Sequence, residues 1–173
     1  MNTHDKYYTI FVVEDSDVYR SIIMQELQSE NETSKSPIHY NVYGFTSGEE
    51  CIEHAYLKPD IMIMDYLLNG NGYLSNMNGL ELLKRIKNII PQLDVIVLSC
   101  QNNIKVIKDF MRAGIREYIK KEGIGQHKVK QVIREHVEKI EKKNKRLHIM
   151  KNGILILAFI ALISVILFSL IYL

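Results

Sequence analysis

The stretch PDIMIMD, residues 59–65, decides the fold, because four consecutive apolar side chains end directly in a carboxylate. A short apolar run bounded by proline and aspartate is typical of a strand that is buried on both faces. An ionised carboxylate beside such a run costs free energy. A chain therefore carries one there mainly where the carboxylate is needed. We therefore expect Asp65 to end a buried strand and to have a chemical role.

Three further apolar runs of strand length also end in polar or charged residues. If all four runs are parallel strands, their carboxyl ends bring three carboxylates, a hydroxyl and an ammonium together at one edge of the sheet. Open α/β sheets bind their ligands at that edge. These runs and their endings are 9–13 with Glu14 and Asp15, 95–98 with Ser99, and 117–119 with Lys120 and Lys121.

Strand-length runs alternate with segments of helical period along the chain, which indicates βαβ units. The pattern predicts an α/β fold, a doubly wound five-stranded parallel sheet of flavodoxin-like order 2-1-3-4-5. The expected strands are 8–14, 38–45, 61–65, 94–99 and 117–120, and the expected helices are 18–29, 48–57, 79–90, 104–113 and one from about residue 126 onward.

The C-terminal part of the chain differs in composition from the rest. Residues 154–173 contain no charge, and 20 residues of helix span roughly 30 Å, the thickness of a bilayer's hydrocarbon core. The preceding residues 126–151 carry nine Lys or Arg and three Glu, whereas the remainder carries 13 basic and 17 acidic residues. We expect a basic juxtamembrane segment, with lipid and not nucleic acid as its partner, and a single transmembrane helix.

The chemistry expected at the sheet edge is magnesium-assisted phosphoryl transfer. Three carboxylates within a few ångströms repel one another, and a hard divalent cation removes that penalty. Asp65 can then stay ionised as a nucleophile. The Ser99 hydroxyl can donate to a phosphoryl oxygen, and a lysine after the last strand supplies a positive charge.

Over about residues 7–140 the sequence resembles the receiver domains of two-component response regulators. The matching motifs are Glu14-Asp15 with Arg20 five positions on, Asp65 after its apolar strand, GLELL at 79–83, Ser99, and AGIREYIKK at 113–121. The resemblance implies Asp65 as the phosphoacceptor; Glu14, Asp15, Asp65 and the backbone carbonyl of Leu67 as Mg²⁺ ligands; and Ser99, Tyr118 and Lys121 as the phosphate-contacting and switch residues.

The chain departs from the family pattern at three places near the expected site. Asn69 stands where the family usually has proline, and the glycine that usually comes eight residues after the acceptor lies 14 residues after it, at Gly79. Glu122 replaces the proline after the lysine, which leaves open whether Lys120 or Lys121 contacts phosphate. Cys100 stands where the family favours alanine.

The resemblance also implies partners and a mechanism. A histidine kinase or phosphotransfer protein would phosphorylate Asp65, and a downstream protein would bind the face made by helix 4, strand 5 and helix 5. No enzymatic activity is expected beyond self-phosphorylation and slow self-dephosphorylation, since Leu67 is apolar. No output domain is expected, and a heptad at Ile133, Ile140 and Leu147 permits a homodimer.

The expected organisation is a receiver domain at 1–141, a basic linker at 142–153 and a transmembrane helix at 154–173, a single-pass protein of the cell membrane with its receiver domain facing the cytoplasm. Two alternatives remain. One is a receiver-like membrane scaffold that works without phosphorylation. The other is a haloacid-dehalogenase-like phosphohydrolase that uses Asp15 as nucleophile and Asp17 as acid/base.

Overall fold

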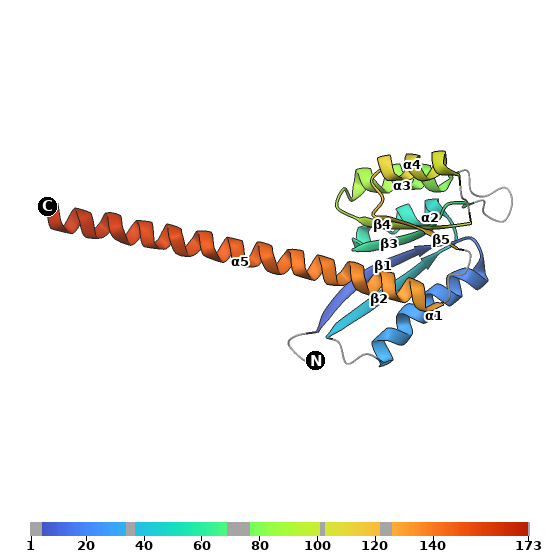
Figure 1. Ribbon diagram of the computed structural model, residues 1–173, viewed down its shortest axis with the longest axis horizontal. Coiled ribbons are helices and arrows are strands. Elements are labelled where there is room, and N and C mark those ends of the chain that lie inside the picture. Colours follow the sequence, from blue (N-terminus) through green and yellow to red (C-terminus); the bar gives the residue numbers. More distant parts are fainter. Residues whose placement is uncertain (1–4, 34–36, 69–76, 101–102, 122–125, 173) are drawn as a thin grey trace. The chain divides into compact units, whose positions relative to one another are not determined.

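Five parallel strands form one sheet in the order β2-β1-β3-β4-β5, as predicted (Figure 1). This computed structural model describes residues 5–33, 37–68, 77–100, 103–121 and 126–172. Its compact units are Met1–Gln131 and Val132–Leu173, and each is described by itself. The strands are β1 (Lys6–Val13), β2 (Ile38–Phe45), β3 (Ile61–Asp65), β4 (Asp94–Ser99) and β5 (Glu117–Lys120).

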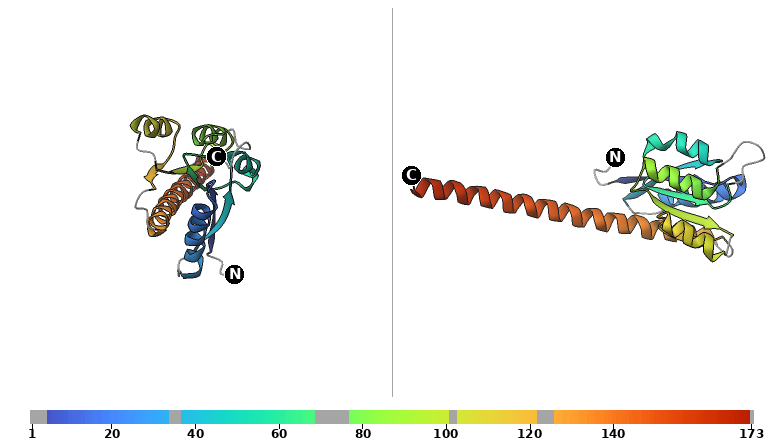
Figure 2. Two further views of the ribbon diagram at one scale, coloured as in Figure 1. Left: turned by 90° about the vertical axis from the view of Figure 1, so that its right-hand side faces the viewer. Right: turned by 90° about the horizontal axis from the view of Figure 1, so that it is seen from above.

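Helices cover both faces of the sheet in the first unit, with α2, α3 and α4 on one face and α1 on the other (Figures 1 and 2). Every residue of β3 is buried, as expected for a central strand. The helices are α1 (Asp17–Thr33), α2 (Gly48–Glu53), the 3₁₀ helix η1 (Ala55–Leu57), α3 (Gly79–Ile89), α4 (Ile104–Arg112) and α5 (Gln126–Tyr172).

The core under α2, α3 and α4 follows the two-residue period of the strands. Phe11 and Val13 of β1 lie in this core with Leu82, Leu83 and Phe110. The intervening residues Ile10 and Val12 are equally buried, and strand alternation directs them to the face covered by α1. Both faces of β1 are therefore packed, which fixes the position of the turn that follows Val13.

Local sequence signals account for both ends of α3. Asn78 caps α3 by accepting a hydrogen bond from the Glu81 N–H, and Pro91 follows its C-terminus. The prediction of one helix over 48–57 is wrong in detail, because α2 ends at Glu53 and a separate 3₁₀ turn follows. The His54 N–H donates to the Cys51 and Ile52 carbonyls, which tightens the chain there, and Lys58 then adopts a left-handed conformation with φ 51°.

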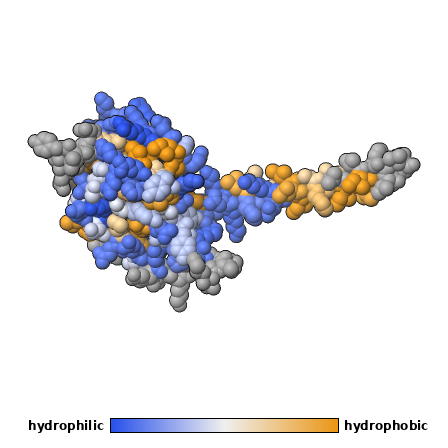
Figure 3. Space-filling view, turned by 180° about the vertical axis from the view of Figure 1, so that it is seen from behind, coloured by the Kyte–Doolittle hydropathy of each residue, from blue (hydrophilic) through white to orange (hydrophobic). Residues whose placement is uncertain are grey.

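Helix α5 runs without interruption through the second unit, as the sequence predicts for the segment from residue 126. Along it, hydrophilic side chains give way to hydrophobic ones toward the C-terminus (Figure 3). The predicted boundaries at 141/142 and 153/154 stay predictions, since the helix is continuous across both.

Within the described part of the chain, no helix is both long enough and apolar enough to cross a membrane. The structure therefore does not support the transmembrane helix predicted at 154–173. Residue 173 and the side chains of residues 162, 165 and 168–172 lie outside the described residues.

Candidate functional site

The turn after β1 holds the first two carboxylates of the site. Glu14 is almost completely buried, with 2 % of its surface exposed, and its N–H donates to the Phe45 carbonyl of β2 at 3.1 Å. Its carboxylate accepts a hydrogen bond from the Ser16 N–H at 3.3 Å. The Arg20 guanidinium donates to the Glu14 carbonyl at 2.7 Å from the first turns of α1. These bonds fix the acidic turn at the carboxyl end of the sheet.

The end of β3 brings the third carboxylate to the same place. Asp65 pairs with Leu98 of β4 in the sheet register, and 8 % of its surface is exposed. One carboxylate oxygen from each of Glu14, Asp15 and Asp65 lies within 4.8 Å of the other two. The predicted convergence of these residues is therefore confirmed, while their roles as metal ligands and phosphoacceptor stay predictions.

Lys121 inserts an ammonium between two of the carboxylates. Its N–H donates to the Ser99 carbonyl at 2.8 Å, which continues the pairing of β5 with β4. Its Nζ lies 2.7 Å from Glu14 Oε2 and 2.9 Å from Asp65 Oδ2. The structure thus places Lys121 in the crevice, whereas the neighbouring Lys120 is exposed. This geometry favours Lys121 over Lys120, and the contact of either lysine with phosphate stays a prediction.

Burial and charge act against each other on these groups. Burial raises the pKa of the Glu14 carboxyl, and the nearby charge of Lys121 opposes that shift without cancelling it. For Lys121, burial acts to lower the pKa, but hydrogen bonds and charge from Asp65 and Glu14 outweigh it and raise the pKa. One ammonium among three carboxylates leaves two negative charges, which a single divalent cation would balance.

The donor set therefore fits Mg²⁺. Carboxylate oxygens are the protein ligands that this ion prefers, and it retains several waters in such sites. Glu14, Asp15 and Asp65 would hold the ion. Leu67 lies two residues beyond Asp65 with a side chain 40 % exposed, and the role of its carbonyl stays a prediction.

Ser99 and Tyr118 lie together beside the acidic cluster. Ser99 is fully buried at the end of β4, and its side chain hydrogen-bonds the Tyr118 hydroxyl. Burial raises the pKa of the Tyr118 phenol, and the negative charge of Asp65 adds to the effect. The Phe110 ring lies edge-on to both Tyr118 and Tyr66, with centroid distances of 6.4 and 5.6 Å. An aromatic row therefore connects Tyr66, the residue after Asp65, to the predicted switch tyrosine Tyr118.

Three contributors to the site were not assigned a role from the sequence. The ring of Tyr19 lies over the Lys121 ammonium, with 5.0 Å from Nζ to the ring centroid. Arg20 anchors the acidic turn through a backbone carbonyl. A Cβ added to Gly79 would lie 2.7 Å from the Tyr66 carbonyl oxygen and 2.9 Å from that of Asp65.

Sequence signals for these three contributors exist but are weak. Tyr19 and Arg20 follow the acidic pair by about one helical turn, which places them near the site. Gly79 opens the motif GLELL 14 residues after Asp65, but this spacing does not show that the glycine packs against Asp65. Asn69 and Glu122, two of the expected departures, lie outside the described residues.

The fold and the acidic crevice define a class of signalling domain, and the comparisons agree. Residues 10–134 match the response regulator receiver domain, and the chain belongs to that family. Receiver domains generally bind Mg²⁺ at an acidic pocket and interact with histidine kinases or phosphotransfer proteins.

Individual relatives share the receiver part of this chain. The chemotaxis protein CheY of Thermotoga maritima is 33 % identical over 84 residues, which cover 47 % of this chain and 65 % of that protein. A cyclic di-GMP phosphodiesterase of the same organism is 27 % identical over 113 residues, 65 % of this chain and 27 % of the relative. The response regulator VraR of Staphylococcus aureus is 36 % identical over 76 residues, 43 % of this chain and 34 % of the relative.

The chain thus covers less than two thirds of each of these relatives. Among solved structures, a signal receiver domain of a Luxo repressor protein from Vibrio parahaemolyticus superposes with a TM-score of 0.65 at 18 % identity, over 80 % of this chain and 96 % of that one. A CheY-like receiver domain from Methanospirillum hungatei gives 0.65 at 19 % identity, over 80 % and 99 %. These likenesses show the fold.

Proposed function

We propose that this receiver domain accepts a phosphoryl group on Asp65 from the phosphohistidine of a histidine kinase or phosphotransfer protein. The observation that carries the proposal is the convergence of Glu14, Asp15 and Asp65 with the Lys121 ammonium. In the transfer, an Asp65 oxygen forms a bond to phosphorus as the bond from phosphorus to the histidine nitrogen breaks. A bound Mg²⁺ would supply neutralising charge for the phosphoryl oxygens.

The residues around Asp65 have distinct roles in this proposal. Lys121 holds the crevice together before transfer and then pairs with a phosphoryl oxygen. The Ser99 hydroxyl donates to another phosphoryl oxygen, which changes its bond to Tyr118. The face of α4 and β5, where Ile104 and Met111 are exposed, then changes its affinity for a downstream protein, so the signal leaves through protein contacts.

The phosphorylated state should be long-lived. Leu67 is apolar and its side chain is 40 % exposed beside the acceptor, so it offers no hydrogen bond to orient a hydrolytic water. We expect Leu67→Asn to speed loss of the phosphoryl group. An unchanged half-life of the phosphorylated full-length chain, measured by intact-mass spectrometry, would count against this role.

We also propose that the C-terminal part of α5 associates with the membrane, with the receiver domain on the cytoplasmic side. Two observations support this. Residues 154–172 carry no charge, and large apolar side chains there are exposed, including Leu155 at 67 % and Phe159 at 63 %. Exposed apolar surface of this extent is uncommon in soluble monomers. Fractionation of cells tests it; recovery of the chain in the soluble fraction and not with the membranes would oppose it.

The phosphoacceptor proposal is tested by incubating the full-length chain in mild detergent with acetyl phosphate and Mg²⁺. Wild type should gain the mass of one phosphoryl group, and Asp65→Asn should gain none. No gain in wild type would favour the scaffold alternative. Steady hydrolysis of acetyl phosphate that requires Asp15 and Asp17 would favour the phosphohydrolase; Asp17 is exposed and pairs with Arg20.

A further inference from the structure

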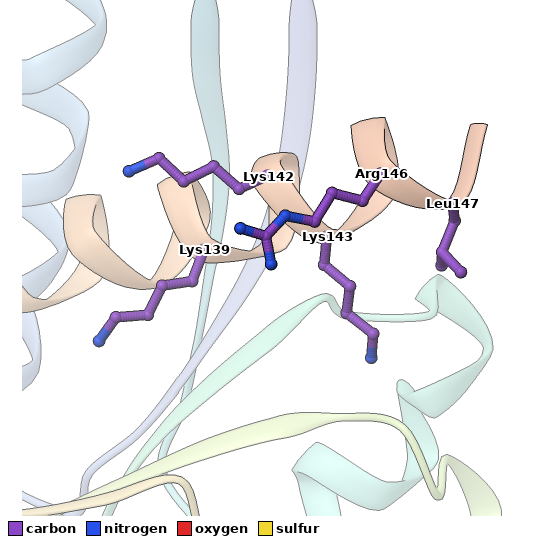
Figure 4. Close-up of a pocket in the computed structure, with 5 residues that line it drawn as sticks. All are labelled: Lys139, Lys142, Lys143, Arg146 and Leu147. Carbon is purple, nitrogen blue, oxygen red and sulfur yellow. The ribbon is translucent and has the colours of Figure 1, made fainter. Parts of the chain in front are cut away.

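A shallow basic pocket lies on one side of α5 within the second unit. It is lined by Lys139, Lys142, Lys143, Arg146 and Leu147. Figure 4 shows the four cationic side chains extending from successive turns of the helix, with Leu147 beside them. Because these residues are spaced three or four apart, they share one helix face. We name the set Lys139, Lys142, Lys143 and Arg146 the basic face.

The charges of the basic face are almost uncompensated. Lys142 lies 3.7 Å from Glu138, an exposed pair that contributes little. Lys139, Lys143 and Arg146 have no ion pair among the residues that the structure describes. Like charges three and four residues apart destabilise a helix. A ligand that supplies several negative charges would relieve this repulsion.

We propose that the basic face binds the phosphate groups of anionic phospholipids at a membrane surface. This inference rests on the proposed membrane association of α5. The lipid is favoured as the occupant because exposed apolar residues, including Ile154, Leu157 and Phe159, follow the basic face on the same helix. A helix that offers ammonium and guanidinium groups and then apolar side chains matches the order of headgroup and acyl layers.

The spacing along the helix predicts a graded contribution. Arg146 precedes Ile154 by eight residues, about 12 Å of helix, and Lys139 precedes it by 15 residues, about 22 Å. The headgroup layer of one leaflet is about 5–8 Å thick, and the attraction fades over about 8 Å at physiological salt. Arg146 should therefore contribute most and Lys139 least.

The experiment uses the full-length chain diluted from detergent into two sets of vesicles, phosphatidylcholine alone and phosphatidylcholine with about one third phosphatidylglycerol. Binding is measured by flotation at low and high salt. One basic side chain near an anionic surface is worth roughly a fivefold gain in binding. Wild type should therefore bind the anionic vesicles at least about 20-fold more tightly than the neutral ones at low salt, and most of this preference should vanish at high salt.

The test variant replaces all four basic-face residues with glutamine. It should lose most of the preference for anionic vesicles and keep the binding to neutral ones. The matched control makes the same change at four exposed lysines of the first unit, Lys58, Lys84, Lys105 and Lys108. This control has the same net charge as the test variant, and it should behave like wild type.

Four outcomes would overturn the inference, and they are distinguishable. If the test variant keeps the wild-type preference for anionic vesicles, the basic face is excluded as the lipid-binding site, while the proposed membrane association still stands. If wild type binds neither set of vesicles, the proposed membrane association is excluded as well. Phosphate gain on Asp65, measured in the same samples, tests the phosphoacceptor proposal separately. Displacement by inorganic phosphate at constant ionic strength would identify free phosphate as the ligand. Salt-sensitive self-association without vesicles would identify a second copy.

Discussion

The acidic crevice at the carboxyl end of the sheet and the basic face of α5 both crowd charges of one sign, but they resolve the repulsion differently. In the crevice, Lys121 lies within 2.9 Å of two carboxylates, and all three side chains are at most 10 % exposed. On the basic face, Lys142 forms an exposed ion pair with Glu138 at 3.7 Å, the single pair of that face among the residues that the structure describes.

This difference separates a site that is organised in advance from a surface that depends on its partner. Buried charges must be paired within the fold, because leaving them unpaired costs several kcal/mol. Exposed charges are tolerated at little cost, because water and salt screen them. The buried charges of the crevice are therefore paired within the fold, whereas the basic face, in our proposal, gains its stabilisation from an anionic surface.

The largest effect should follow removal of the internal cation. Lys121→Met leaves Glu14 and Asp65 buried without their partner, and the free energy of unfolding should fall by about 3 kcal/mol without Mg²⁺. Lys120→Met, at the exposed neighbouring position, should change it by less than about 0.5 kcal/mol. Urea titrations followed by circular dichroism measure both. Equal effects at the two positions would mean that the crevice is not held by Lys121.

A glycine-to-alanine pair compares the packing of the two regions. Gly79→Ala places a Cβ against the Tyr66 and Asp65 carbonyls, so we expect a loss of about 2 kcal/mol and slower phosphate gain. Gly153 has nothing within 4 Å of an added Cβ, and Gly153→Ala should raise the helix content of α5 through its propensity alone. Thermal unfolding of both variants gives the comparison; a stabilising Gly79→Ala would contradict the close approach.

The pH dependence should report the same ion pairs. Because the folded-state pKa of Lys121 is raised above 10.5, its stabilisation is fully present below pH 10.5 and is lost as the pH rises through the folded value. Between neutral pH and pH 10.5, the gap in unfolding free energy between wild type and Lys121→Met should be constant. Above it, the gap should shrink by up to about 1.4 kcal/mol per pH unit. A gap that grows above pH 10.5 would contradict the assigned direction.

The smallest expected effect concerns the ring over Lys121. A cation–π contact at an exposed site contributes about 0.5–1 kcal/mol, so Tyr19→Leu should weaken the fold by that amount and Tyr19→Phe by less. Tyr56→Leu, at a tyrosine 70 % exposed, provides the control. In a Lys121→Met background the Tyr19→Leu effect should disappear. A double-mutant cycle with no coupling between the two positions would exclude the contact.

The sequence was sufficient for the sheet and for most of the crevice, and the reason is physical. Parallel strands buried on both faces read as continuous apolar runs, so their ends, at Glu14, Asp65 and Ser99, stand out as polar residues after each run. Strand order follows from the alternation of strands and helices once the fold class is recognised. These features depend on local sequence and on the order of strands and helices, and both can be read from the amino-acid sequence.

The remaining features depend on three-dimensional register and could not be read in this way. The family motif aligns Lys121 with the phosphate-pairing lysine, but only the pairing of Lys120 with Ser99 in the sheet shows that the next side chain enters the crevice. The split of the second helix after Glu53 has no local signature, and the spacing of Tyr19 from the acidic pair places it near the site without showing its contact with Lys121. The family motif identifies Gly79 in the sequence, but its close approach to the Asp65 carbonyl is visible only in the structure.

Magnesium titration tests most directly whether the crowded carboxylates form a cation site that supports phosphoryl transfer to Asp65. Isothermal calorimetry on the full-length chain should show one Mg²⁺ bound per molecule, and Glu14→Gln and Asp15→Asn should each weaken binding by at least about tenfold. If both variants bound Mg²⁺ as tightly as wild type, the ion would lie elsewhere and the account of the crevice would be wrong.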